Sequence, residues 1–450
     1  MSQTLVQYEN NYGLLSHERA ALRVRRHAGP ILLLALAARL AAVLIFYGFS
    51  SIPPLTSWGV EMIATALSIH NGHGFSSPFV SDSGPTAFSP PGSVLLIASV
   101  MRFFGTGSLA ATAIVLLQVG FSVMTVWLVM FTARRHFGDR AANFAGLICA
   151  IFPSFVVAPV KIGDAAVSAL LVALVFAGAS TLQVARWRFI PAGAICAIAG
   201  LMNPVLIPTM WALCAWAAWK VKQFPWMGIL AFLIVFSPWP IRNAVVMHAF
   251  VPLRSNFGYE LYMGNHAGGN GDFPQTMNPM MDGNERRAFL REGEMNYMSE
   301  KGASARNYIA SHKSRFALLT LRRVGQFWAG AEDGGGPTTI PLLVLSLGGF
   351  AMLWRRKELS VLYALPLILF PMPYYITHVS MRFQYPIDPM LAILGASALS
   401  AFLVGREARR RDPVLRGRGA LGAARLHPAT VELLTTRAPR RSGGRSTRSR

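Results

Sequence analysis

Acidic side chains of this 450-residue chain stand at the ends of its apolar runs, where they could act on a substrate at a membrane surface. Glu61 lies in the stretch 58–75, after the first apolar run, and Asp164 lies immediately before another. A carboxylate so placed can take the proton from an attacking hydroxyl group, a step worth roughly 10²–10⁴-fold in rate. Glu61 is therefore the candidate general base, and Asp164 is the second candidate acid.

Three arginines could bind an anionic group at the same depth. Arg242, Arg254 and Arg382 lie on the predicted outer side, at the end of an apolar run or in the loop beyond it. A guanidinium group binds phosphate through paired hydrogen bonds and stabilises negative charge on a leaving group. One carboxylate base with these arginines suits transfer of a group from a phosphate-linked donor to a hydroxyl.

Each of these residues also has a structural alternative. Asp164 could cap the helix that follows it, and Glu61 could cap or salt-bridge a juxtamembrane helix. Arg242 and Arg382 could be interfacial anchors whose charged ends reach the lipid headgroups. Arg254 could serve only the structure of its loop.

The elements that must position these residues are apolar helices. Hydrophobic residues make up 53% of the chain and charged residues only 14%, against about a quarter in soluble domains. Apolar runs near the ~20 residues needed to cross a bilayer recur along it. The sequence predicts an all-α, polytopic membrane helical bundle. Its ten predicted spans are 30–49, 111–132, 141–159, 163–183, 189–203, 204–219, 226–242, 338–354, 359–377 and 387–404.

The charges of the short loops predict which side each loop faces. With the N-terminus in the cytoplasm, the basic clusters at 134–140, 186–188, 220–222 and 355–357 all fall on the cytoplasmic side. The run Pro91–Phe104 is short for a crossing, so we expect an interfacial helix on the outer surface. The stretch 189–219, interrupted at Asn203-Pro204, is predicted to cross twice; a single crossing would reverse every later loop.

The domain organisation follows from this topology. We expect a cytoplasmic N-terminal segment at 1–29 and a transmembrane domain at 30–404, with external loops 50–109 and 243–337. A basic cytoplasmic tail occupies 405–450, and its last 45 residues hold 13 arginines against three acidic residues. This tail supplies much of the net charge of +22 and suits anionic membrane lipids better than nucleic acid. No metal-ligand spacing or cofactor motif is present, and a divalent cation requirement stays open.

Several segments, in order, resemble the GT-C superfamily of bacterial membrane glycosyltransferases, which includes protein O-mannosyltransferases and the lipid A aminoarabinose transferase (glycosyltransferase family 39-like). Glu61 with Asn71-Gly-His-Gly-Phe75 resembles their first-loop signature, and Gly84-Pro-Thr-Ala-Phe-Ser-Pro-Pro-Gly92 is similar to their Pro-Pro segment. Residues 238–265 and 382–389 resemble two later elements of these enzymes. Glu61 stands alone where the family often has an Asp or an Asp-Glu pair.

The resemblance implies periplasmic juxtamembrane helices and transfer of a hexose or pentose from a polyprenyl-phosphate donor. The acceptor would be a lipid, glycan or protein at the outer face of the bacterial cytoplasmic membrane, and the transfer would invert the anomeric carbon. Glu61 and Asp164 would be catalytic. The substrate-binding residues would be Arg242, Arg254, Asn256, Glu260, Asn265, Arg382 and Tyr385.

Two other functions remain open on the sequence. A transporter or flippase of lipid-linked glycans would have ionisable groups near the bilayer midplane and paired broken helices. A non-catalytic scaffold with the same fold would also fit the lone Glu61. The acids at the ends of the spans favour the enzyme.

Overall fold

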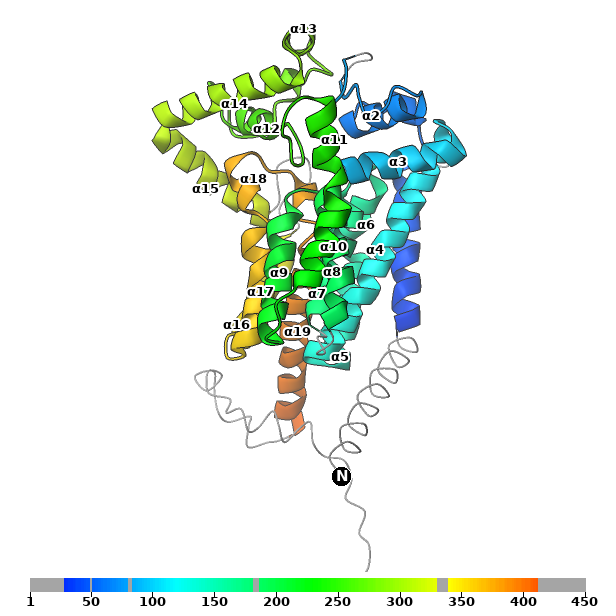
Figure 1. Cartoon of the computed structure of the whole chain (residues 1–450). Coiled ribbons are helices and arrows are strands. Elements are labelled where there is room, and N and C mark those ends of the chain that lie inside the picture. The colour runs from blue at the N-terminus through cyan, green and yellow to red at the C-terminus, as the bar shows by residue number, and fades with distance from the viewer. Residues whose placement is uncertain (1–27, 49–50, 80–82, 181–185, 330–338, 412–450) are drawn as a thin grey trace, which may run out of the picture. The chain divides into compact units, whose positions relative to one another are not determined.

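The computed structural model describes residues 28–48, 51–79, 83–180, 186–329 and 339–411 (Figure 1). Most of the predicted N-terminal segment and the tail beyond 411 lie outside these residues. The described residues up to Ser400 belong to one compact unit, and the second unit is described only over residues 401–411, the end of α19.

The described residues are all-helical, as predicted, apart from loops and one isolated bridge between Ser76 and Pro85. The first helix is Ala28–Tyr47. The others are α2 (Glu61–His70), α3 (Pro91–Phe104), α4 (Ser108–Phe137), α5 (Asp139–Ile151), α6 (Pro153–Val157), α7 (Ala165–Ser180), α8 (Phe189–Met202), α9 (Leu206–Lys220), α10 (Trp226–Phe236), α11 (Pro238–Val246), α12 (Phe257–Gly264), α13 (Gly283–Glu292), α14 (Glu294–Ser311), α15 (Lys313–Ala329), α16 (Ile340–Leu353), α17 (Lys357–Leu369), α18 (Met372–Ile376) and α19 (Asp388–Arg411). Short 3₁₀ turns η1–η5 lie at Leu55–Ser57, Ala158–Val160, Arg186–Arg188, Gln275–Met277 and Met381–Phe383.

Five helices among the described residues are long and apolar enough to cross a bilayer. They are Ala28–Tyr47, Ser108–Phe137, Trp226–Val246, Leu359–Ile376 and Asp388–Glu407. Shorter apolar helices fill three further predicted spans, and the run Pro91–Phe104 is helical, as predicted. The protein is thus a multi-pass membrane protein, while the count of ten crossings stays a prediction.

Proline interrupts the helix in two predicted apolar stretches, with a bend in one and a reversal of direction in the other. The stretch 141–159 is not one straight helix, because α5 ends at Ile151 and the chain bends by 59° before continuing as Pro153–Val160. At Asn203-Pro204 the chain instead reverses. The sulfur atoms of Cys196 in α8 and Cys214 in α9 lie 3.5 Å apart, which requires the two helices to run side by side. The stretch 189–219 therefore forms two short helices side by side, while its two membrane crossings stay a prediction.

Small residues let these helices approach closely. A Cβ atom placed on Gly193 of α8 would lie 1.9 Å from the carbonyl oxygen of Gly228 in α10. One placed on Gly349 of α16 would lie 2.0 Å from the carbonyl oxygen of Leu394 in α19. Such backbone contact is typical of helices that pack within membranes, where association depends on close packing.

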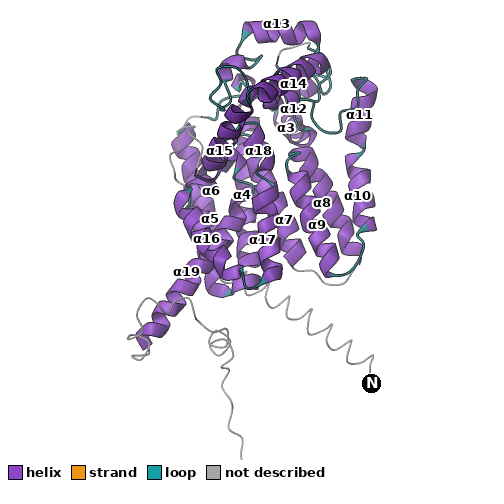
Figure 2. Cartoon of the chain, turned by 90° about the vertical axis from the view of Figure 1, so that its left-hand side faces the viewer, coloured by secondary structure: helices purple, strands orange, loops and turns teal. Residues whose placement is uncertain are grey.

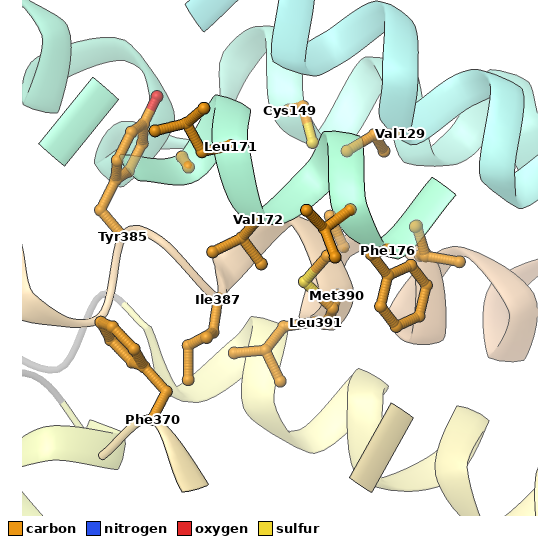
Figure 3. Packing of buried hydrophobic residues seen from close by; sticks show 14 of the residues in the cluster. Val129, Cys149, Leu171, Val172, Phe176, Phe370, Tyr385, Ile387, Met390 and Leu391 are labelled. Carbon is orange, nitrogen blue, oxygen red and sulfur yellow. The ribbon is translucent and has the colours of Figure 1, made fainter. Parts of the chain in front are cut away.

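Helices α7 and α19 meet in the middle of the bundle (Figure 3). Val172 and Phe176 of α7 lie against Ile387, just before α19, and against Met390 and Leu391 in its first turn, and all five are buried. This contact fixes the segment 382–388 against the bundle.

One end of the bundle carries the helices of both predicted external loops. Figures 1 and 2 show α3, α11, α12, α13 and α14 gathered at this end, and in Figure 1 α2 and α3 lie crosswise to α4. The second external loop contains the successive helices α13, α14 and α15, with a break at Gly293, whose φ is 75°. This end is where the candidate residues meet.

Candidate active site

The loop before α12 and the first turn of α12 bring together three of the predicted substrate-binding residues. Asn256 precedes the helix and donates from its amide to Glu260 Oε1 at 2.6 Å. Arg254 Nη2 lies 3.7 Å from the same carboxylate oxygen, and Arg254 Nε donates to the Phe88 carbonyl at 2.7 Å. The arginine therefore joins the Pro-Pro segment to α12 while its side chain stays 28% exposed.

Residues of the segment before α19 also lie near the Glu260 carboxylate. His378 Nδ1 lies 3.5 Å from Glu260 Oε2, and the His378 ring packs between Phe273 and Phe383. Burial raises the pKa of Glu260, and Arg254 and Arg382 act against that shift. Arg382 is exposed, with its guanidinium 5.3 Å from the centre of the Phe383 ring.

Asp164 is related to these residues by its proximity to Tyr374 of α18. The Tyr374 hydroxyl lies within electrostatic reach of Asp164, Arg382 and Arg254. Asp164 itself precedes α7, and its carbonyl accepts the amide of Ser168 in the first turn. Three segments distant in the sequence thus converge, and we call Asp164, Arg254, Glu260, His378 and Arg382 the outer charged cluster.

Glu61 begins α2, where a carboxylate also complements the helix dipole. Its Oε1 accepts a hydrogen bond of 2.8 Å from the Asn278 side chain, which belongs to the loop after α12. Burial raises the pKa of Tyr259, and Tyr297, Glu260 and Glu61 raise it further. Glu61 and Glu260 are therefore both within electrostatic reach of Tyr259, on the side of the molecule that holds the outer charged cluster.

Arg242 is occupied within the protein. It donates to the carbonyls of Thr86 and Phe75, at 2.7 Å each, and to the Asn243 side chain at 3.0 Å. Its guanidinium also lies over the rings of Phe75 and Trp239. Through these contacts Arg242 connects α11 to the first external loop. The structure does not bring Arg242 into the outer charged cluster.

Two other predicted substrate-binding residues lie apart from this cluster. Asn265 is buried; it donates to the carbonyls of Leu261 and Ile376 and accepts from Arg323 at 3.2 Å. Tyr385 is buried in the bundle, where its hydroxyl lies 2.9 Å from Ser122 Oγ (Figure 3). Both stand near predicted site residues in the sequence, but their side chains point into packed structure.

Asn278, Glu294 and the pairing of His378 with Glu260 could not be predicted from the sequence. Glu294, the first residue of α14, is buried and accepts from the Ala87 amide at 2.8 Å, from Ser255 Oγ at 2.7 Å and from the Thr86 hydroxyl. Burial raises the pKa of Glu294, and those hydrogen bonds oppose the shift. An acid followed by Met and Asn carries no motif, and the sequence does not mark the helix start at Glu294.

No group of three or more His, Cys, Asp or Glu side chains that could hold a metal ion occurs among the described residues. The chemistry available there is proton transfer by carboxylates and charge stabilisation by arginines. Both suit attack of a hydroxyl on a centre that carries an anionic leaving group.

Comparison with known proteins gives a family and two similar structures. Residues 89–241 match the family of dolichyl-phosphate-mannose-protein mannosyltransferases. No protein of curated function matches the chain. Among solved structures, ArnT from Cupriavidus metallidurans bound to undecaprenyl phosphate is similar at 17% identity and a TM-score of 0.40, over 85% of this chain and 80% of that one. The apo oligosaccharyltransferase of Archaeoglobus fulgidus is similar at 14% identity and a TM-score of 0.49, and this chain spans about half its length (85% of this chain, 51% of that one).

The family match confirms the predicted resemblance to the GT-C superfamily over a stretch that includes Asp164. Together with the helical membrane bundle it defines the class of protein, a membrane glycosyltransferase.

Proposed function

We propose that this protein transfers a sugar from a polyprenyl-phosphate donor to a hydroxyl group of an acceptor at the outer face of the bacterial cytoplasmic membrane. The observation that carries the proposal is the outer charged cluster, in which Arg254, Arg382 and Asp164 come from separate segments around Glu260 and Tyr374. The matched family is described by a lipid-phosphate-linked sugar donor, which supports the donor class.

In the proposed reaction Glu61 takes the proton of the acceptor hydroxyl as its oxygen attacks the anomeric carbon. The bond between that carbon and the donor phosphate oxygen breaks, and the phosphate leaves with the electron pair. Arg254 and Arg382 stabilise the charge that develops on it. Attack on the face opposite the leaving group inverts the anomeric carbon. Asp164 orients the acceptor or the sugar, and Arg242 holds the first loop in place.

The test is sugar transfer by purified protein from a panel of polyprenyl-phosphate sugars. Glu61→Gln keeps the size of the side chain and an oxygen that can accept from Asn278, while it removes the base. We expect a loss of roughly 10²-fold or more. Glu300→Gln, an exposed glutamate of α14, is the matched control and should transfer normally.

Other results redirect the proposal. Equal transfer by Glu61→Gln and wild type would move the base elsewhere, and Asp164→Asn would then be tested. No transfer by folded wild-type protein across a broad panel would reject the enzyme.

One observation favours transport of a lipid-linked glycan as the second candidate. Arg39 and Asp388 are buried at 0% and 2% exposure, and the span that contains α5 is broken, as in many transporters. Movement of a fluorescent lipid-linked sugar across liposomes that contain the protein would support this function.

A further inference from the structure

Arg39 is a fully buried charge in the first helix, Ala28–Tyr47, and the proposed reaction does not use it. Its Nε donates to Ser122 Oγ at 2.8 Å, and its Nη2 donates to the carbonyl of Cys149 at 3.0 Å. Nη1 donates to the carbonyls of Ala35, at 2.9 Å, and Ala150, at 3.5 Å. A charge kept inside a membrane bundle is costly, so its contacts need an explanation.

The contacts of Arg39 with α5 supply hydrogen bonds to backbone carbonyls that Pro153 leaves without amide donors. In a continuous helix the amide of residue 153 would bond to the Cys149 carbonyl, but proline has no amide hydrogen. Phe152 is extended, with ψ at 133°, and the amides of Phe155 and Val156 bond to the Phe152 carbonyl instead. The break deprives the carbonyls of residues 149, 150 and 151 of their helical partners, and the Arg39 guanidinium binds the first two.

Buried polar contacts continue from Arg39 toward Asp164. Gln118 lies one turn before Ser122 on α4, and both are buried. Its amide donates to the carbonyls of Pro159 and Lys161 at 3.2 Å, and its oxygen accepts the Gly163 amide at 3.0 Å. The turn that ends at Asp164 is therefore held at several points by the same face of α4.

A second path leads toward Arg382. The Ser122 hydroxyl that accepts from Arg39 also lies 2.9 Å from the Tyr385 hydroxyl, three residues after Arg382. At the start of α19, Asp388 accepts from Ser154 Oγ at 3.0 Å, which attaches the segment after the break to the same stretch.

We propose that Arg39 is a positioning residue of the active site, which fixes the α5–α6 break and thereby the places of Asp164 and Arg382. Arginine suits this task because its planar fork reaches two carbonyls and a hydroxyl at once, which a lysine point charge does not. The inference rests on the proposed function for its kinetic effect, while its structural part stands independently.

The kinetic test compares Arg39→Met and Arg39→Lys with wild type. Since misplacement of a reacting group by about 1 Å can cost on the order of 10²-fold, we expect kcat to fall by that order in Arg39→Met, with a smaller change in KM. Arg39→Lys should recover part of the loss. A folded Arg39→Met variant with kcat within about two-fold of wild type would overturn the proposal. If Arg39→Met does not fold, Ser122→Ala takes its place. We expect Ser122→Ala to lower kcat by on the order of 10-fold, which corresponds to one hydrogen bond to a charged group. An unchanged kcat in this variant would overturn the proposal.

A labelling test separates this inference from the proposed function. Lys161 is exposed in the turn before Asp164, so a Lys161→Cys variant reports the position of that turn through its rate of reaction with a membrane-impermeant maleimide. Adding Arg39→Met should change this rate several-fold, and Glu300→Cys on α14 should not respond. The parent protein supplies the background, because its described cysteines are buried or half-buried. Equal rates with and without Arg39→Met would overturn the proposal whether or not the protein transfers sugar.

Discussion

Arg323 and Arg382 are the same residue type near the same end of the bundle, and the structure uses them in opposite ways. Arg323 is fully buried and donates to the carbonyls of Gly264 and Gly271 and to Asn265. Burial lowers the pKa of Arg323 to about 10. Arg382 is exposed and lies in the field of Glu260. An arginine whose donors are consumed by backbone carbonyls has none left for a substrate, so donor use separates the structural Arg323 from Arg382, which we propose binds the donor phosphate.

The largest expected effect is on catalysis through Arg382. Arg382→Met removes a charge that we place on the leaving phosphate, and loss of one such group costs roughly 10²–10³-fold in kcat. Stability should change by no more than about 0.5 kcal/mol, because the side chain is exposed. Transfer rates and thermal unfolding of the same preparation measure both quantities.

Arg102→Met is the control for this substitution. Arg102 is an exposed arginine of α3, outside the outer charged cluster, and its loss should leave transfer unchanged. An equal fall in both variants would point to a general effect of surface charge and would remove Arg382 from the site.

In contrast to Arg382→Met, Arg323→Met should lower the stability of the protein and leave donor binding unchanged. It leaves the Gly264 and Gly271 carbonyls without their donor inside the protein, and each such buried group costs about 1–3 kcal/mol. We expect a loss of about 3 kcal/mol in unfolding free energy. Any remaining folded protein should bind donor normally. Thermal unfolding beside donor titration tests this, and weakened binding by a stable variant would place Arg323 in the site.

Much of the fold was readable in the sequence because it depends on local pattern. Apolar length predicted the helices, and Asn203-Pro204 marked the reversal between α8 and α9. Pro153 offered a similar signal within 141–159, but apolar composition alone does not tell a continuous span from a broken one. The break became evident only from the bend and from the Arg39 contacts.

The site was readable only in part because a residue's neighbours in sequence do not decide where its side chain points. Arg254, Asn256 and Glu260 come from one short stretch, and their side chains meet because the loop before α12 and its first turn place them together. Tyr385 stands three residues from Arg382, yet it faces the bundle core. Direction there depends on how the 382–388 segment packs against α4 and α7, which is a tertiary property.

The smallest expected effect concerns the pH response of Glu260, where burial and the arginines compete. Burial raises the pKa of Glu260 above its ordinary value of 4.5, so the folded protein holds this proton more tightly than the unfolded chain. The resulting stabilisation is complete below the unfolded pKa and is lost as pH rises through the folded pKa. Glu260→Gln abolishes this titration, so the stability of the variant relative to wild type should increase from pH 4.5 upward. Thermal unfolding across that range measures this difference in stability, with Glu300→Gln as the control, and a difference that stays flat or falls would refute the prediction.

A donor phosphate bound by Arg254 and Arg382 would add negative charge beside the Glu260 carboxylate and raise the pKa of Glu260 further. Donor binding should then be accompanied by proton uptake in wild type but not in Glu260→Gln, which ties this half-buried acid to the arginines of the same cluster.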